Sequence, residues 1–393
     1  GSLYVIAPTD AEYGTLKTNF TTNDSADVST LTSGTVPLSG SSTTISVLGT
    51  ISASNVTLAG GSVTLGENNT TVTLSTTGDI ILSAANSITN NEAVTAGGSV
   101  SMNSTGTITN NANVSAASAI TMNAGTAIDN STGGDITISS SGGNITLTAG
   151  TSIINDAVTA TNGAISMDTS NGSGSIENTG AVTAGTTLTE KAKTTLTNSA
   201  AVKAATGITM EAGNSISNGS TVEATGGAIA MTATNNGITN TGAVTATGES
   251  SSVSMSATNT SAGAIQNDAN VTAGNGITMT AGTTIDNSNN SLLVSSAKGG
   301  ISLTAGTSIT NDAVTASAGS VSMTANKGNI TNNGALQALG TSSTVNLTAK
   351  DSSAGAITNN ANVTAGNGIT MTADTAIDNS NSSLVVSSTS GDI

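Results

Sequence analysis

Three aspartates at one recurring position are the residues whose type and spacing come closest to acid–base chemistry. Asp129, Asp286 and Asp378 each directly precede an asparagine. Two carboxylates at a suitable separation can act as acid and base in glycoside hydrolysis. Such sites also need Arg, Lys or His and aromatic platforms for sugar, yet the sequence has no Arg or His, and no aromatic follows Phe20. We therefore expect no enzyme activity, no catalytic residue and no cofactor, with a polysaccharide-degrading enzyme as a minor alternative.

Two further aspartates raise the question of a metal site. Asp156 and Asp312 follow Asn155 and Asn311, so several oxygen ligands of the kind that Ca²⁺ prefers are close together. The glycine-rich nonapeptide that binds Ca²⁺ in β-helices is missing. The pattern favours structural turns and no metal site, and a calcium-binding surface module is a minor alternative.

Threonine pairs could also order water. Flat arrays of Thr-x-Thr on solenoids bind ice, and the chain has such pairs at Thr146/Thr148, Thr278/Thr280 and Thr370/Thr372. The other copies of this position carry Ser, Asn, Asp, Lys, Ala or Glu in one or both places. Because three scattered pairs do not make a regular lattice, ice binding is a minor alternative as well.

The composition points to a narrow core of small repeated residues. Only 1% of the residues are aromatic and 8% are charged, whereas Gly, Ser, Thr, Asn and Ala dominate. A wide globular core needs aromatics and large aliphatics to fill it. Disordered segments lack regularly spaced β-branched residues, but here Val, Ile and Thr recur at fixed intervals. An ordered repeat structure is therefore predicted.

The charge balance limits the partners. The net charge is −16, with 7 basic and 23 acidic residues. Nucleic-acid binding depends on Lys and Arg that neutralise phosphates, so we expect no nucleic-acid partner. Apolar runs are only a few residues long, so no transmembrane helix and no membrane insertion are expected. The absence of Cys leaves the compartment open.

Three short alternating segments recur from about residue 80 onward, and each defines one side of a repeating turn. The Asn side reads Ile/Leu-x-Asn, the Val side reads Val-x-Ala, and the Met side reads Ile/Val-x-Met/Leu. The asparagines, at intervals of 20 to 27 residues, are Asn90, Asn110, Asn130, Asn155, Asn178, Asn198, Asn218, Asn240, Asn267, Asn287, Asn311, Asn332, Asn359 and Asn379. All nine methionines lie on the Met side, at Met102, Met122, Met167, Met210, Met231, Met255, Met279, Met323 and Met371.

These spacings predict an all-β fold, a right-handed parallel β-solenoid with three sides per turn and turns of 20–27 residues. Apolar alternation with a period of two marks half-buried strands. Right-handed crossovers are the general rule for parallel strands. The methionines are predicted to fill the core. The asparagines are predicted to form a structural ladder, because a buried amide without partners costs about 1–3 kcal/mol.

Glu190 interrupts the Met side, where it takes the place of a methionine in the segment Leu188–Lys193. A buried carboxylate is costly unless it is paired. We therefore expect a local bulge that turns Glu190 outward toward Lys191 and Lys193, and we assign it no function.

The chain divides into three predicted parts. Residues 1–43 hold every aromatic and both prolines, and are predicted to cap or dock the solenoid, whose open end needs cover. Residues 44–79 form irregular first turns, and residues 80–393 form the regular array. Within it a unit of 92 residues, four turns long, is duplicated: the segment Ala269–Ala281 recurs unchanged at Ala361–Ala373.

The repeats resemble those of filamentous-haemagglutinin-like exoproteins, which are large secreted bacterial adhesins. The residues that carry the resemblance are G-I-T-M-T-A-G-T-x-I-x-N, as in Gly276–Asn287, and A-V-T-A, as in Ala313–Ala316. The resemblance covers roughly residues 80–393 and implies an extracellular rod for adhesion or surface structure.

We expect a non-catalytic structural rod of a bacterial surface adhesin or surface filament, secreted to the cell surface. Ile393 aligns with Ile301, so the sequence given stops where a strand begins. This predicts either a longer native rod or a self-polymerising subunit whose end docks head-to-tail on residues 1–43 of the next copy. A host or surface glycan or protein receptor is a further expected partner, with inserted loops such as Thr247–Ser252 or Asp351–Gly355 as its contact surface.

Overall fold

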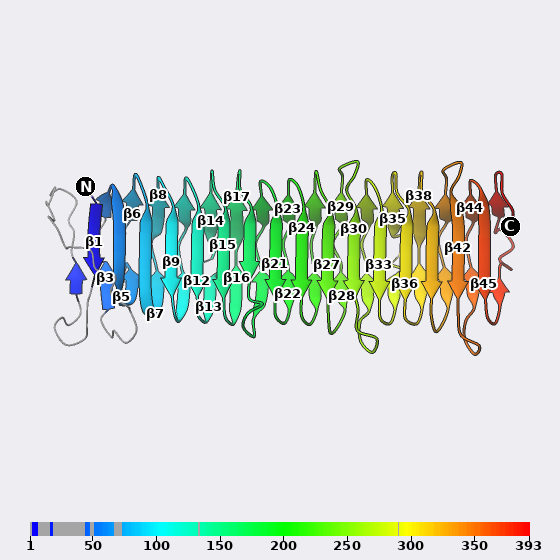
Figure 1. Ribbon diagram of the computed structural model, residues 1–393, viewed down its shortest axis with the longest axis horizontal. Helices are drawn as coiled ribbons and strands as arrows, with labels where there is room; N and C mark the ends of the chain where they lie inside the picture. The colour runs from blue at the N-terminus through cyan, green and yellow to red at the C-terminus, as the bar shows by residue number, and fades with distance from the viewer. Residues whose placement is uncertain are drawn as a thin grey trace. The chain divides into compact units, whose positions relative to one another are not determined.

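The computed structural model is a parallel β-solenoid of about 14 turns (Figure 1). It describes residues 2–6, 16–18, 44–47, 51–66, 73–132, 134–289 and 291–393, and every regular element in these ranges is a β-strand. The chain divides into two units, residues 1–193 and residues 194–393. The predicted all-β parallel solenoid is thereby confirmed, while the right-handed winding and the three sides per turn stay predictions.

The regular turns of the first unit repeat three strands. The Met side is formed by β9 (Val100–Ser104), β12 (Ile120–Ala124), β15 (Ile145–Ala149), β18 (Ile165–Asp168) and β21 (Leu188–Ala192). The Asn side is formed by β10 (Thr107–Asn110), β13 (Ala127–Asn130), β16 (Ser152–Asn155) and β19 (Ser175–Asn178). The Val side is formed by β4 (Ile51–Ala53), β6 (Thr73–Thr76), β8 (Ala93–Ala96), β11 (Val114–Ala116), β14 (Thr137–Ser140), β17 (Ala157–Ala160) and β20 (Val182–Ala184).

The first turns of this unit are built from longer strands. β5 (Asn55–Leu65) and β7 (Ile80–Asn90) each span the Met side and the Asn side without a break. β1 (Ser2–Ile6) pairs in parallel with β5, and β2 (Leu16–Thr18) pairs with β3 (Thr44–Val47). Of the predicted cap, residues 1–43, only these two short strands are among the described residues, and the cap stays a prediction.

The second unit repeats the same three strands with fewer irregularities. Its Met side is β24 (Ile208–Ala212), β27 (Ile229–Ala233), β30 (Val253–Ala257), β33 (Ile277–Ala281), β36 (Ile301–Ala305), β39 (Val321–Ala325), β42 (Thr344–Ala349) and β45 (Gly368–Ala373). Its Asn side is β22 (Leu196–Asn198), β25 (Ile216–Asn218), β28 (Ile238–Asn240), β31 (Ile265–Asn267), β34 (Ile285–Asn287), β37 (Ile309–Asn311), β40 (Ile330–Asn332), β43 (Ile357–Asn359) and β46 (Ile377–Asp378). Its Val side is β23 (Val202–Ala204), β26 (Val222–Ala224), β29 (Val244–Ala246), β32 (Val271–Ala273), β35 (Leu293–Ser296), β38 (Ala313–Ala316), β41 (Leu336–Ala338), β44 (Val363–Ala365) and β47 (Val386–Ser388).

Strands of successive turns pair in register, so that each inward residue lies on its equivalent in the next turn. Ile277 aligns with Ile301, and Met279 aligns with Leu303. The register offset is 20 residues where Ile108 aligns with Ile128, and 27 where Ile238 aligns with Ile265. In parallel strands that pair in register, each inward residue lies beside its equivalent in the next turn. The repeat length in the sequence is therefore the number of residues in one turn.

The core is the column of inward residues along each side. Ile, Val, Leu, Met and Ala in these columns are 0–5% exposed, except in the last turn, where Met371 is half-buried and Ile377 is 46% exposed. Between sides the chain turns at small residues, because successive corners stack closely. A Cβ added at Gly306 would lie 1.8 Å from the carbonyl oxygen of Gly282 in the turn before, so this corner has no room for a side chain.

Candidate functional site

The asparagines of the Asn side lie inside the solenoid. Thirteen of the fourteen are 0–1% exposed, and Asn379 is exposed. In the first unit the side-chain amide of Asn110 donates to Asn130 at 2.6 Å, Asn130 donates to Asn155 at 2.7 Å, and Asn155 donates to Asn178 at 3.0 Å. Asn130 and Asn155 thereby each accept from one turn and donate to the next, which satisfies these buried amides along the axis.

The second unit has the same ladder over more turns. At 2.7–3.4 Å, each Nδ2 donates to the next Oδ1 along Asn218, Asn240, Asn267, Asn287, Asn311, Asn332, Asn359 and Asn379. Every donor points toward the higher-numbered turn, so the amide dipoles are aligned. The first acceptor of this ladder, Asn218 Oδ1, is buried without a hydrogen-bond partner among the described residues, as are Asn90 Nδ2 and Asn110 Oδ1 in the first unit.

The methionines line the core beside this ladder. Eight of the nine are 0% exposed, and Met371 is half-buried. In several turns the asparagine also directs its amide nitrogen at the sulfur of the methionine twelve residues later. This contact is 3.5 Å for Asn110 and Met122, and 3.2 Å for Asn311 and Met323. A thioether is a weak hydrogen-bond acceptor. Methionine therefore fills the core and also accepts a weak hydrogen bond from the second N–H of the amide.

Glu190 is inside the core, and the expected bulge is wrong. Its side chain is 0% exposed, and it aligns with Met167 without a shift in register. Asn178 Nδ2 donates to Glu190 Oε1 at 2.7 Å. The carboxyl thus takes over the position in which other turns place a methionine sulfur, and this polar partner outweighs the tendency of a carboxylate to turn outward.

The aspartates considered for acid–base chemistry hold loops in place. Asp129 accepts hydrogen bonds from the backbone N–H of Ser131 at 2.9 Å and from its hydroxyl at 2.7 Å. Burial alone would raise the pKa of Asp129, but the bonds from Ser131 and Thr132 outweigh it and set that pKa below its ordinary value. Hydrogen bonds from Ser380 likewise lower the pKa of Asp378. Asp286 accepts from Ser288 in the same way, so the recurring aspartate is a turn-forming residue.

The two aspartates considered for calcium also bond to backbone. Asp156 Oδ2 accepts from the N–H of Ile136, and Asp312 Oδ2 accepts from the N–H of Leu292, both at 3.1 Å. Each bond fastens the longer corner loop of the preceding turn. Within the part of the chain that the structure describes, no three His, Cys, Asp or Glu side chains are grouped so that they could hold a metal ion.

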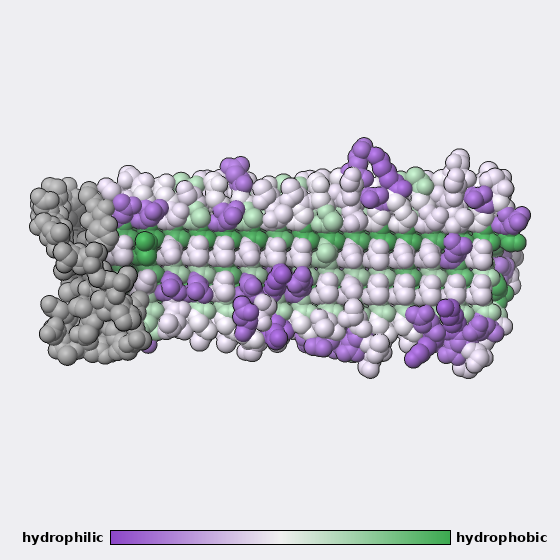
Figure 2. Space-filling view, in the orientation of Figure 1, coloured by the Kyte–Doolittle hydropathy of each residue, from purple (hydrophilic) through white to green (hydrophobic). Residues whose placement is uncertain are grey.

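One column of outward Met-side positions is threonine on the last five strands of the second unit, whereas β24, β27 and β30 carry Glu211, Thr232 and Ser256 there. Pairing places Thr280, Thr304, Thr324, Thr348 and Thr372 in register on successive strands. The neighbouring column is mixed, since it holds Thr278, Ser302, Ser322, Asn346 and Thr370. Figure 2 shows these outward positions as regular pale rows between lines of apolar residues. The threonines are therefore less scattered than the sequence analysis expected, but only in one column.

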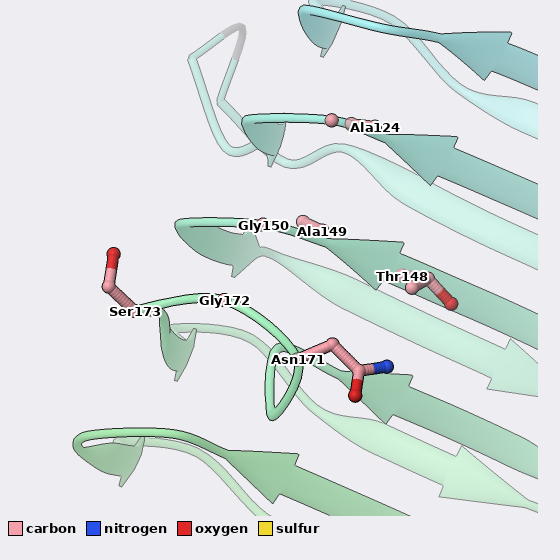
Figure 3. Close-up of a pocket in the computed structure, with 8 residues that line it drawn as sticks. Ala124, Thr148, Ala149, Gly150, Asn171, Gly172 and Ser173 are labelled. Carbon is pink, nitrogen blue, oxygen red and sulfur yellow. The ribbon is translucent and has the colours of Figure 1, made fainter.

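A shallow hollow of about 530 Å³ lies at a corner of the first unit (Figure 3). Its floor is the stacked backbone of Gly125, Gly150 and Gly172, and a Cβ added at Gly172 would lie 1.7 Å from the carbonyl oxygen of Gly150. Asn171 and Ser173 lie on either side of Gly172. The hollow is thus the place where glycine corners stack without side chains.

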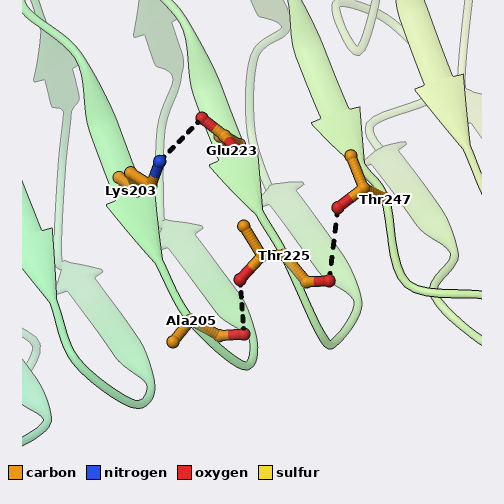
Figure 4. Close-up of polar contacts among 5 residues, drawn as sticks. All are labelled: Lys203, Ala205, Glu223, Thr225 and Thr247. Carbon is orange, nitrogen blue, oxygen red and sulfur yellow. Dashed lines mark hydrogen bonds and ion pairs between the residues drawn. The ribbon is translucent and has the colours of Figure 1, made fainter.

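The Val side of the second unit carries polar contacts between neighbouring turns (Figure 4). Lys203 and Glu223 lie opposite each other on β23 and β26, with 3.3 Å between ammonium and carboxylate. Both are well exposed, and such pairs contribute little to stability. At the adjoining corners the Thr225 hydroxyl donates to the Ala205 carbonyl at 3.0 Å, and Thr247 donates to Thr225 at 3.2 Å.

The loops considered as contact surfaces are held by their own side chains. Asp351 accepts from the backbone and the hydroxyl of Ser353 at 2.8 and 2.7 Å, and these bonds lower the pKa of Asp351. Glu249, at the tip of the loop Thr247–Ser252, pairs with Lys298 at 2.8 Å, and this bond lowers the pKa of Glu249. Neither loop, both of which lie within the described residues, brings together three His, Cys, Asp or Glu side chains that could hold a metal ion.

No protein-family model, curated protein or solved structure matches this chain. None of the described residues forms a helix that is long and apolar enough to span a membrane.

Proposed function

We propose that this chain is a structural segment of an extracellular bacterial rod, in a surface adhesin or a surface filament, and that it performs no catalysis. One observation carries the proposal: inward residues of the same type lie in register in turn after turn, such as Ile277 on Ile301 and Ala281 on Ala305. In a sequence organised in this way, the number of repeated turns sets the length of the rod. Its recurring aspartates and asparagines serve loops and the ladder.

The adhesin-like identity rests on where the resembling segments lie. G-I-T-M-T-A-G-T-x-I-x-N covers β33 and β34, and A-V-T-A is β38, so the resemblance lies in the strands and corners that build each turn. Export to the cell surface and a host glycan or protein receptor belong to this proposal. The net charge of −16 supports partners other than nucleic acid.

A seamless deletion tests the structural role. Removal of residues 277–368 joins Gly276 to Ile369, and the sequence that follows, ITMTA, is the same before and after deletion. We expect the shortened chain to fold and its longest dimension in electron micrographs to fall by about 19 Å, four turns of about 4.8 Å each. A shortened chain that no longer folds, or whose length is unchanged, would contradict a modular structural segment.

A second candidate is a self-polymerising subunit with head-to-tail contacts. Residues 2–6 favour it, because β1 joins β5 through the same parallel pairing that joins one turn to the next. A strand of another chain could add to a solenoid by that pairing. Sedimentation over a range of concentrations separates the two: filaments that disappear when residues 1–43 are deleted support the subunit, and monomers at every concentration support the spacer.

A further inference from the structure

The turn that contains Glu190 departs from the other turns of the first unit in its core. On β12 and β15 the inward residues are Ile, Met or Leu, and Ala. On β21 they are Leu188, Glu190 and Ala192, with the same alternation of buried and half-buried positions. A single polar side chain therefore occupies a column that is otherwise apolar in this unit, and it does so without any change in backbone register.

The carboxyl interacts strongly with the amide ladder. The Asn178 amide nitrogen lies 2.7 Å from Glu190 Oε1, whereas the corresponding distance from Asn155 to the Met167 sulfur is 3.4 Å. The aligned amides from Asn110 to Asn178 all donate in the same direction, so their positive ends point at the carboxyl. Aligned dipoles of this kind favour a negative group at their donor end.

A hydrogen-bonded carboxyl nevertheless stabilises the core less than a methionine at the same position does. Removing it from water carries a desolvation penalty that good partners only offset, and well-packed apolar groups in the same place are often as stable or more stable. When β21 is locally exposed, Glu190 is solvated again, and the recovered desolvation penalty offsets part of the free-energy cost of opening. Exposure of β12 or β15, by contrast, only loses buried apolar surface.

The pairing of β21 with the preceding turn covers four residues, from Leu188 to Lys191, as does the pairing of β15 with β18, whereas β12 and β15 align over five. Directly after β18, the backbone N–H of Thr169 still donates to the Lys191 carbonyl at 2.8 Å. β18 is followed by the six-residue corner 169–174, in which Thr169 Oγ1 is buried without a hydrogen-bond partner among the described residues. A buried hydroxyl without a partner next to the paired strand lowers the local stability of this turn.

The residues that flank Glu190 suit an open arrangement. Lys191 is half-buried and Lys193 is exposed, and both follow Glu190 within three residues. If β21 detaches, a rotation of the strand brings the carboxylate to water beside these two ammonium groups.

We propose that β21 (Leu188–Ala192) is the local opening point of the first unit, a strand that detaches and exposes Glu190 to water more readily than the other Met-side strands. This turn of the first unit then opens locally before the others do. This inference concerns the stability of one strand and does not rest on the proposed function.

Native-state hydrogen exchange of the full chain tests the proposal. Amides of β21 are expected to exchange at least about tenfold faster than those of β12 and β15. Glu190→Met, which restores the residue type of the other turns, is expected to slow β21 by about tenfold or more and to leave β12 unchanged. Glu190→Gln is expected to give an intermediate rate, because an amide is polar but costs less to remove from water than a carboxyl that can ionise.

The proposal is overturned by protection of β21 equal to that of β12 and β15 in the unaltered chain. It is also overturned by a β21 rate that Glu190→Met does not slow. A matched variant, Met122→Glu, places a carboxyl on β12, where pairing covers five residues; faster exchange confined to β12 supports the role of the carboxyl, and no change there contradicts it.

Discussion

The inward positions of each turn are restricted in residue type, whereas its corners vary in length. Inside, the columns repeat one residue type, and Asn240 lies between Asn218 and Asn267 in a bonded ladder. At the corners the chain varies in length, so the register offset between turns ranges from 20 to 27 residues. The difference teaches that stacking constrains the inward positions strictly, whereas a corner only has to return the chain to the next strand.

The strongest test of this contrast is the loss of a core side chain. Met255 is 0% exposed and aligns with Met231 and Met279 in the neighbouring turns. Met255→Ala is expected to lower the free energy of unfolding by about 2–5 kcal/mol, since it leaves a cavity in a close-packed column. Denaturant unfolding measures the change, with the outward Ser256→Ala as control. Equal losses in the two variants would show that Met255 is not a core residue.

A smaller loss is expected in the ladder. Asn240→Ala removes both bonds at once and leaves an amide N–H of Asn218 and a carbonyl oxygen of Asn267 without their partner, at a cost of about 1–3 kcal/mol. Thr239→Ala, on the outward side of the same strand, is the matched control and should be near neutral. If the two variants unfold at the same denaturant concentration, the ladder does not stabilise the chain.

The ladder also shows how far the sequence could predict this structure. Spacing alone gave the strands, the turn length and the inward position of asparagines such as Asn240. It did not give the contact between Asn311 and Met323, although a separation of twelve residues recurs in several turns of the sequence and was a visible signal. Glu190 was assigned outward because the cost of burial was weighed without the amide of Asn178, which only the arrangement of neighbouring sides brings within 2.7 Å.

Substitutions of corner residues should change the free energy of unfolding only slightly, and one of them should change its dependence on pH. The hydrogen bonds from Ser131 and Thr132 keep the pKa of Asp129 below its ordinary value although burial opposes them. A lowered pKa stabilises the fold above the pKa of the unfolded chain, and this contribution is lost as the pH falls through the folded value. As the pH falls below the ordinary pKa of an aspartate, the unaltered chain should therefore lose more stability than Asp129→Asn, by a small amount because the side chain is partly exposed. Parallel pH profiles for both proteins would contradict this.

The smallest effect is expected where a corner loop is tied only by an exposed ion pair. Glu249 and Lys298 lie 2.8 Å apart, and the Glu249 side chain is 84% exposed. Glu249→Ala should not change the unfolding midpoint measurably, because solvent and salt screen such pairs. A clear loss of stability would mean that this loop contributes to the fold as the interior does.

Cysteine cross-linking tests the in-register stacking most directly, and the chain has no native Cys to interfere. Thr304 and Thr324 face each other on β36 and β39, so Thr304→Cys with Thr324→Cys places two Cα atoms about 4.8 Å apart, within the reach of a disulfide. Ser302→Cys with Thr324→Cys is the diagonal control, at about 8 Å and out of reach. We predict efficient oxidation of the first pair and little of the second. Equal cross-linking of both pairs, or preference for the diagonal, would contradict a solenoid that stacks like residue on like.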